Sequence, residues 1–166
     1  MNASERHLLI DGYNVIYDWP ELRKELGRGG GAMARDRLVG MVRVIHDVEG
    51  CRLTVVFDGK GSRVEIERPG RELTFSVLYS PEGMSADEVI EQLVGSSGNP
   101  EQFQVVTRDS LERQTVEAFG ASGLSPADLL DWIDRCQKRL GADVSHLRGN
   151  VDGAWRRKSK NLKSET

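Results

Sequence analysis

Short apolar runs that each lead to an aspartate constrain this chain most strongly. Three such runs, Leu8–Ile10, Val55–Phe57 and Val105–Val106, are separated by segments with helical periodicity. Strands that are apolar along their whole length are typical of a parallel sheet covered by helices on both faces. The pattern therefore predicts an α/β fold with a mainly parallel central sheet.

Acidic residues follow the predicted strands at their carboxyl ends. The three runs lead to Asp11, Asp58 and Asp109, and a fourth acid, Asp87, lies in the first turn of the helix after the strand at 72–80. The carboxyl ends of parallel strands meet at one edge of the sheet, where ligands bind in such folds. We therefore expect the four carboxylates to gather at this edge.

Each acid also has a local structural explanation. Asp11 and Asp58 both precede a glycine, as in turns. Asp109 with Glu112 matches a helix capping box, and so does Ser85 with Glu88. These explanations account for each residue alone, but not for the recurrence of acids at the same end of successive strands.

Helical geometry separates Asp87 from its neighbour Glu88. At about 100° per residue, Asp87 falls at the edge of the apolar stripe of its helix, whereas Glu88 points nearly to the opposite side. We therefore expect Asp87 to lean over the end of the sheet and Glu88 to close the capping box.

Several carboxylates held within a few ångströms of one another repel unless a cation or a proton separates them. Oxygen ligands without nearby histidine or cysteine favour Mg²⁺ or Mn²⁺ over Zn²⁺. Such an ion can activate water and stabilise a developing phosphate oxyanion. The acids thus point to hydrolysis of a phosphodiester or a phosphomonoester.

The chain of 166 residues is long enough for one domain with a buried core. Its formal net charge of −3 does not indicate nucleic-acid binding, so any basic surface must be local. Cys51 and Cys136 are far apart and form no metal-ligand pair, which favours buried thiols in a reducing cytosol. No stretch has the length and apolarity of a signal peptide or a membrane span, so we expect a cytoplasmic protein.

The expected helices and strands place these residues along the chain. Strands are expected at 7–11, 52–59, 72–80 and 103–109, and helices at 18–27, 34–50, 85–95, 110–119 and from 125 to near 141. We predict a domain at 1–141 and a mobile, polar, basic tail at 142–166. In the tail, Arg156, Arg157 and Lys158 are candidate contacts to phosphates, and a solvated end is the alternative.

The chain also resembles a known family. The segments LIDGYNVI, ARDRL, VVFDG, SADEVIE, VVTRD and FGASGLSPADLL resemble, in this order, the YacP-like NYN-domain proteins of the PIN-like nuclease superfamily, over about residues 7–140. The resemblance implies a PIN-like three-layer α/β/α sandwich and a cytoplasmic, metal-dependent endoribonuclease. It also implies RNA as partner, including ribosome-associated mRNA, and Mg²⁺ or Mn²⁺ as cofactor.

The resemblance assigns roles to individual residues. It implies that Asp11, Asp87 and Asp109 are catalytic metal ligands, with Asp58 and Asn14 as accessory residues. Two arginines are candidate RNA contacts. Arg108 stands where relatives often have a small hydroxyl residue, and its alternative is to point to solvent. Arg35 lies in the ARDRL segment, and its alternative is a helix-surface residue paired with a nearby acid.

Three functions compete. The first is an endoribonuclease, and the second is a catalytically silent RNA- or ribosome-binding module with the same fold, which would not need four carboxylates near phosphates. The third is a phosphatase or a receiver domain. A haloacid-type phosphatase requires a second Asp two residues from the first, where this chain has Leu9 and Tyr13. We find no Lys at the end of the last strand, which a receiver domain requires.

Overall fold

One twisted sheet organises the molecule. A computed structural model describes the backbone of residues 5–163 and, beyond residue 150, only the side chains of Arg156 and Arg157. Within this range the strands are β1 (His7–Asp11), β2 (Arg52–Phe57), β3 (Glu65–Glu67), β4 (Phe75–Tyr79), β5 (Phe103–Val106) and β6 (Ser122–Leu124). They pair in the order β3-β4-β2-β1-β5-β6, and only β3, which forms a hairpin with β4, is antiparallel to its neighbour. The predicted mainly parallel sheet is confirmed.

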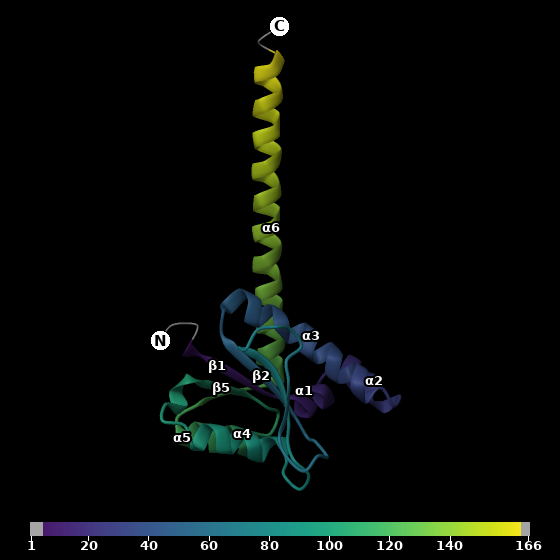
Figure 1. Cartoon of the computed structure of the whole chain (residues 1–166), viewed down its shortest axis with the longest axis vertical. Helices are drawn as coiled ribbons and strands as arrows, with labels where there is room; N and C mark the ends of the chain where they lie inside the picture. The colour runs from purple at the N-terminus through teal and green to yellow at the C-terminus, as the bar shows by residue number, and fades with distance from the viewer. Residues whose placement is uncertain (1–4, 164–166) are drawn as a thin grey trace.

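Helices cover both faces of the sheet (Figure 1). One face carries α1 (Gly12–Asp18), α2 (Pro20–Gly27), α3 (Gly31–Glu49) and the first turns of α6 (Pro126–Lys163), and the other carries α4 (Ala86–Gly95) and α5 (Ser110–Phe119). Side chains of β1 alternate between the two layers: Leu8 and Ile10 belong to the first core cluster, and Leu9 belongs to the second. This arrangement is the predicted three-layer α/β/α sandwich.

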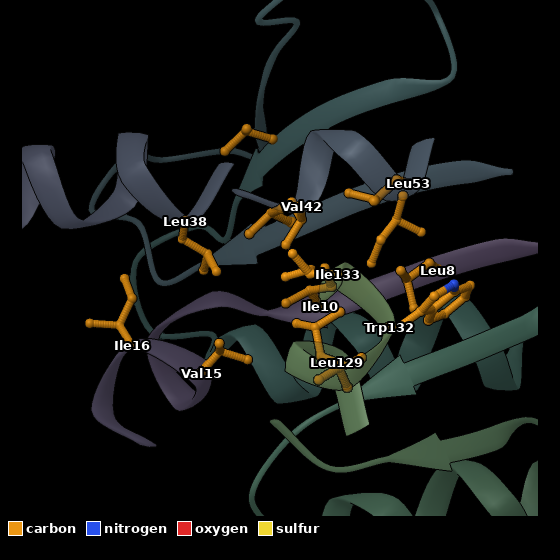
Figure 2. Close-up of a cluster of buried hydrophobic side chains, with 14 of the residues drawn as sticks. Leu8, Ile10, Val15, Ile16, Leu38, Val42, Leu53, Leu129, Trp132 and Ile133 are labelled. Carbon is orange, nitrogen blue, oxygen red and sulfur yellow. The ribbon is translucent and has the colours of Figure 1, made fainter. Parts of the chain in front are cut away.

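The larger of the two cores joins β1 and β2 to α3 and α6. Figure 2 shows Leu8 and Ile10 of β1 beside Leu129 and Ile133 of α6, with Val42 of α3 close by. All five side chains are buried. Burial of such apolar side chains stabilises the fold by roughly 1.5–3 kcal/mol for each side chain. The start of α6 is therefore an integral part of the domain.

The direction in which successive strands are added to the sheet reverses at β1. From β1 the chain adds β2 and β4 on one side, and it then returns to add β5 and β6 on the other side. The helices that follow β1 and β5, α1 and α5, accordingly leave the same edge on opposite faces. Ligands of open α/β sheets bind outside the carboxyl ends of the strands at such a switch point, which here lies between Asp11 and Asp109.

Most predicted elements are present, and their ends follow known capping rules. Gly50 ends α3 in the left-handed conformation (φ 64°), and Ser85 and Glu88 form the predicted capping box of α4. The sequence did not predict α1 or β6. Each is short, with 7 and 3 residues respectively, so neither contains enough turns or alternations to show a period.

The predicted end of the last helix near Gly141 is wrong, because α6 continues to Lys163 and its second half extends away from the sheet (Figure 1). The second half of α6 contains three glycines, Gly141, Gly149 and Gly153. Glycine is about 1 kcal/mol less favourable than alanine inside a helix, so the sequence did not indicate that the helix continues. The segment after 141 is therefore helical rather than irregular. A domain boundary between 141 and 142 stays a prediction, and it would fall inside α6.

Two expectations from composition concern thiols and membranes. Cys51 and Cys136 are free and buried, as predicted, and burial raises the pKa of both thiols. No helix within residues 5–163 combines the length and the apolarity that crossing a membrane requires.

Two helical glycines should respond oppositely to alanine. A Cβ at Gly12 would lie 2.2 Å from Cε1 of the buried Phe57 ring, whereas a Cβ at Gly40 meets no atom within 4 Å. We expect Gly12→Ala to lower the free energy of unfolding by roughly 1–3 kcal/mol through overpacking. Gly40→Ala should raise it by about 0.5–1 kcal/mol. Denaturant melts of both variants check this, and equal stability of the two would contradict the close packing at Gly12.

Candidate active site

Asp11 is delivered to the switch point by the central strand. It is the last residue of β1, it is only 3% exposed, and its backbone pairs with β2. Nδ2 of Asn14, one turn later in α1, donates a hydrogen bond to Oδ2 of Asp11 at 3.0 Å. The predicted amide therefore orients the predicted carboxylate.

A fifth acid, Glu112, joins this site. It lies in the first turn of α5, it is 1% exposed, and neither of its carboxyl oxygens accepts a hydrogen bond from a described protein group. Besides burial, the charges of Asp11 and Asp87 raise its pKa. A buried carboxyl group without a donor is costly in its ionised form, so Glu112 requires either a proton or a cation.

Asp11 and Glu112 titrate as a pair. Burial, with the charges of Asp58 and Asp87, raises the pKa of Asp11 to about 6, although hydrogen bonding by Asn14 opposes the shift. Burial and the charge of Asp11 raise the pKa of Glu112 to about 8. Near neutral pH, Glu112 is therefore the protonated member of the pair.

The predicted capping box at Asp109 and Glu112 is wrong. Asp109 does cap α5, because its Oδ1 accepts a hydrogen bond from the backbone N–H of Leu111 at 2.9 Å. Glu112 is turned inward instead of reaching back to the helix end. A signal was available in the sequence: Glu112 lies four residues before the buried Val116, on the same helix face, but the capping motif explained it first.

Asp58, directly after β2, and Asp87, in the first turn of α4, are the next acids around this pair. Oδ1 of Asp58 accepts a hydrogen bond from the backbone N–H of Ala86 at 2.8 Å, which ties the end of β2 to the start of α4. Asp87 is half-buried and Glu88 is exposed, as the helical phase predicted. Asp87 raises the pKa of Asp11, Glu112 and Glu91. It is thus the central charge of the site.

Asp109 stands apart from Asp11. It is exposed, its backbone N–H donates to Oγ1 of Thr107 at 3.1 Å, and its charge raises the pKa of Glu91. The structure therefore brings Asp11, Asp58 and Asp87 together with Glu112, and it places Asp109 at the outer side of this group.

The donor chemistry fits a hard divalent cation, although the side chains are not arranged as a closed cage. In the described part of the chain, no three His, Cys, Asp or Glu side chains converge so as to hold a metal ion. One carboxyl oxygen of Asp58 and one of Asp109 already accept a hydrogen bond from a backbone N–H at the start of a helix. The uncompensated oxygens of Glu112 beside Asp11 and Asp87 are the ligand type that Mg²⁺ and Mn²⁺ prefer.

The predicted RNA-contacting arginines divide into two groups. Arg108 lies over the ring of Tyr17 at 5.4 Å, and Arg35 donates to the hydroxyl of Tyr13 at 3.0 Å rather than to a nearby acid. Both arginines therefore adjoin α1 and the site. Arg156 and Arg157 are exposed far along α6, and the side chain of Lys158 lies outside the described residues.

The acid pair should make the metal-free protein less stable as the pH rises. Both pKa values are raised above their ordinary values, 3.8 for Asp11 and 4.5 for Glu112, so the folded state binds more protons than the unfolded state between about pH 4 and pH 8. We expect the free energy of unfolding in EDTA to fall across this window, and Glu112→Gln to remove a part on the order of 2 kcal/mol of this fall.

Urea melts at several pH values check this expectation. Glu117→Gln, which changes an exposed carboxylate of the same helix, is the matched control and should keep the wild-type dependence on pH. A wild-type free energy of unfolding that rises between about pH 5 and pH 8 would contradict the buried pair.

Comparisons with known proteins agree with this architecture. The model of the YacP-like NYN domain family matches residues 8–166. Over 144 residues the chain is 33% identical to the Bacillus subtilis (strain 168) protein named "Uncharacterized protein YacP", which covers 84% of this chain and 82% of that protein. NYN domains form a PIN-like nuclease group, which indicates an RNA-related nuclease function.

Two crystal structures of Rae1 (YacP) from Bacillus subtilis are similar to the whole fold. One has a TM-score of 0.70 at 28% identity and covers 93% of this chain and 88% of that chain. The other, a Trp-to-Leu mutant, has a TM-score of 0.68 at 30% identity and covers 86% and 82%. With the family model matching nearly the entire length, this chain belongs to the YacP-like NYN domain family.

Proposed function

We propose that this protein is a divalent-metal-dependent endoribonuclease that hydrolyses RNA phosphodiester bonds at the carboxyl edge of its sheet. The observation that carries the proposal is the buried pair of Asp11 and Glu112, faced by Asp87 at the switch point of a nuclease-type fold. Perturbed carboxyl groups gathered at one edge are typical of catalytic sites.

Asp11, Asp87 and Asp109 are the proposed metal ligands, and Glu112 is added to the predicted set. A bound Mg²⁺ or Mn²⁺ would supply an activated water and would neutralise charge on the phosphate. Asp109 stands outside the group around Asp11, so its carboxylate would have to leave the helix cap to join the others.

The other residues of the site position these carboxylates. Asn14 holds one oxygen of Asp11, and Asp58 holds the start of α4, the helix that carries Asp87. Near neutral pH, Glu112 keeps a proton that it can lose when positive charge arrives, which lets the site adapt to a cation.

A silent RNA-binding or ribosome-binding module is the alternative. It is less well supported, because two buried acids beside a third are destabilising in the absence of a cation and contribute nothing to phosphate binding. The alternative would gain support if RNA bound tightly but remained uncut with Mn²⁺ present.

Neighbouring acids on α4 offer a matched pair of variants. Asp87→Asn should lower cleavage of single-stranded RNA at fixed Mn²⁺ by roughly 10²-fold to 10³-fold and weaken Mn²⁺ binding. Glu88→Gln should change neither, because Glu88 is exposed and accepts a hydrogen bond from the backbone N–H of Ser85, which glutamine can also accept.

Calorimetric titration with Mn²⁺ and a cleavage assay on each variant provide the two measurements, and thermal melts verify folding. Loss of activity in Glu88→Gln but not in Asp87→Asn would move the site to the other side of α4. Full activity in both variants would refute a catalytic role for this turn.

RNA is the proposed partner, and the exposed end of α6 is a second place for it to bind. Arg156 and Arg157 lie on the helix that extends from the domain, and Lys158 follows them in the sequence. Contact with ribosome-associated mRNA and a cytoplasmic location remain predictions from the resemblance and the composition.

Replacement of both arginines should reduce the dependence of RNA binding on salt. Each phosphate contact on a single strand contributes about 0.7 to the slope of log K against log salt. The double variant Arg156→Gln/Arg157→Gln should therefore lower the slope by about 1.4 and leave cleavage at saturating RNA near the wild-type rate. Titrations at several salt concentrations measure the slope, and an unchanged slope would mean that these arginines do not contact RNA.

A further inference from the structure

A groove separate from the acid cluster has no role in the proposed reaction so far. It has a volume of about 720 Å³ and lies between α3, the turn after β3 and the β4 strand. Its walls include apolar and aromatic side chains, among them Val39, Pro69 and Tyr79, and arginines stand at its rim. This size and this mixture are typical of pockets that hold a nucleotide-sized ligand.

A row of aromatic rings connects this groove to the acids. Tyr79 is stacked on Phe57 with ring centroids 5.9 Å apart, and Phe57 meets the edge of Tyr13 at 5.1 Å. Tyr13 in turn neighbours Tyr17 at 6.5 Å, and Arg108 covers the ring of Tyr17. The row therefore runs along the carboxyl edge from the end of β4 to the end of β5.

The groove and the site share a wall. The ring of Phe57 lies directly against the Cα of Gly12, the residue that follows Asp11. One buried ring, Phe57, therefore packs against both the groove and the residue after Asp11, and at Gly12 this packing is too tight to admit even a methyl group.

Cationic groups at the groove suit an anionic ligand. Arg43 is engaged in ion pairs with Asp47 and Glu72. Arg35 and Arg68 also line the groove, together with the acids Asp36 and Glu67. Within the described residues, neither of these two arginines forms an ion pair. These two guanidinium groups can each bind a phosphate through paired N–H donors.

We propose that this groove is a binding subsite for an unpaired nucleotide of single-stranded RNA. The base stacks against Tyr79 and the neighbouring apolar wall, and Arg35 and Arg68 contact its flanking phosphates. Aromatic rings and arginine planes recognise splayed bases of single strands, whereas a paired base is not available to enter such a groove. The inference rests on the proposed function, because it assigns a place to the strand whose phosphodiester bond the acids cut.

Gly40 is a position from which a larger side chain can be directed into the groove. It lines the groove in the middle of α3, and an added Cβ meets no atom within 4 Å. Gly40→Trp should therefore fold and occupy the space of the base. Gln137→Trp is the control, since it places the same ring on the exposed surface of α6, next to residues that contact Glu49 at the opposite edge of the sheet.

Fluorescence anisotropy in EDTA measures binding without cleavage. We expect Gly40→Trp to bind a labelled single-stranded oligoribonucleotide about ten-fold more weakly than the wild type, because a base–aromatic stack is lost. A labelled hairpin duplex should bind both proteins equally, and Gln137→Trp should match the wild type on both RNAs. Equal affinity of Gly40→Trp and wild type for the single strand would overturn the proposal, and so would an equal loss on single strand and duplex.

Photocrosslinking of the wild type gives a second measurement that needs no variant. A single strand that contains 4-thiouridine should crosslink to Tyr79 or to the turn at Pro69, and crosslinks confined to α6 would overturn the subsite. The two proposals fail separately. A wild type that binds single strands in the groove but cleaves none refutes the endoribonuclease and supports the subsite. A Gly40→Trp variant that binds and cleaves as the wild type does refutes the subsite alone.

Discussion

Burial of β1 on both faces is the constraint on which the rest of the molecule depends. Leu8, Leu9 and Ile10 are fully buried because helices cover the strand from both sides. The carboxyl end of this central strand lies at the switch point of the topology, where the order of the strands reverses. Asp11 is therefore placed where a carboxylate has little water around it, and its raised pKa is a consequence of the fold rather than of one local contact.

The scaffold tolerates the repulsion between the acids because it fixes each of them through a different element. Asn14 of α1 holds Asp11, Asp58 ties β2 to α4, and α5 turns Glu112 inward. The protein thus accepts a destabilising charge cluster that a purely structural core would avoid, and such exceptions to good packing are concentrated at functional sites.

The sequence predicted the structure correctly where a hydrophobic pattern or a helical period distinguished one arrangement from another. Continuous apolar strands predicted the parallel sheet, and helical phase placed Asp87 inward and Glu88 outward. The prediction was wrong where the same residues fit two different structures. Glu112 satisfied a capping motif, and only the packing of α5 against α4, β5 and β6 decides that it is buried. The second half of α6 failed for a related reason, since its glycines and charges indicate a loop unless the helix is already anchored by its first turns.

Charge sets the remaining limit on how this protein can hold RNA. The chain has a net charge of −3, and its acids lie at the edge where the proposed function requires a phosphate to bind. Long-range attraction is therefore weak, and binding must depend on local groups: a cation among the carboxylates, arginines beside them, and stacking, which is insensitive to charge. Arg35 and Arg108 both contact tyrosines of α1, the helix that begins directly after Asp11. Two guanidinium groups and two tyrosine rings thus adjoin the short helix that begins directly after the Asp11 carboxylate.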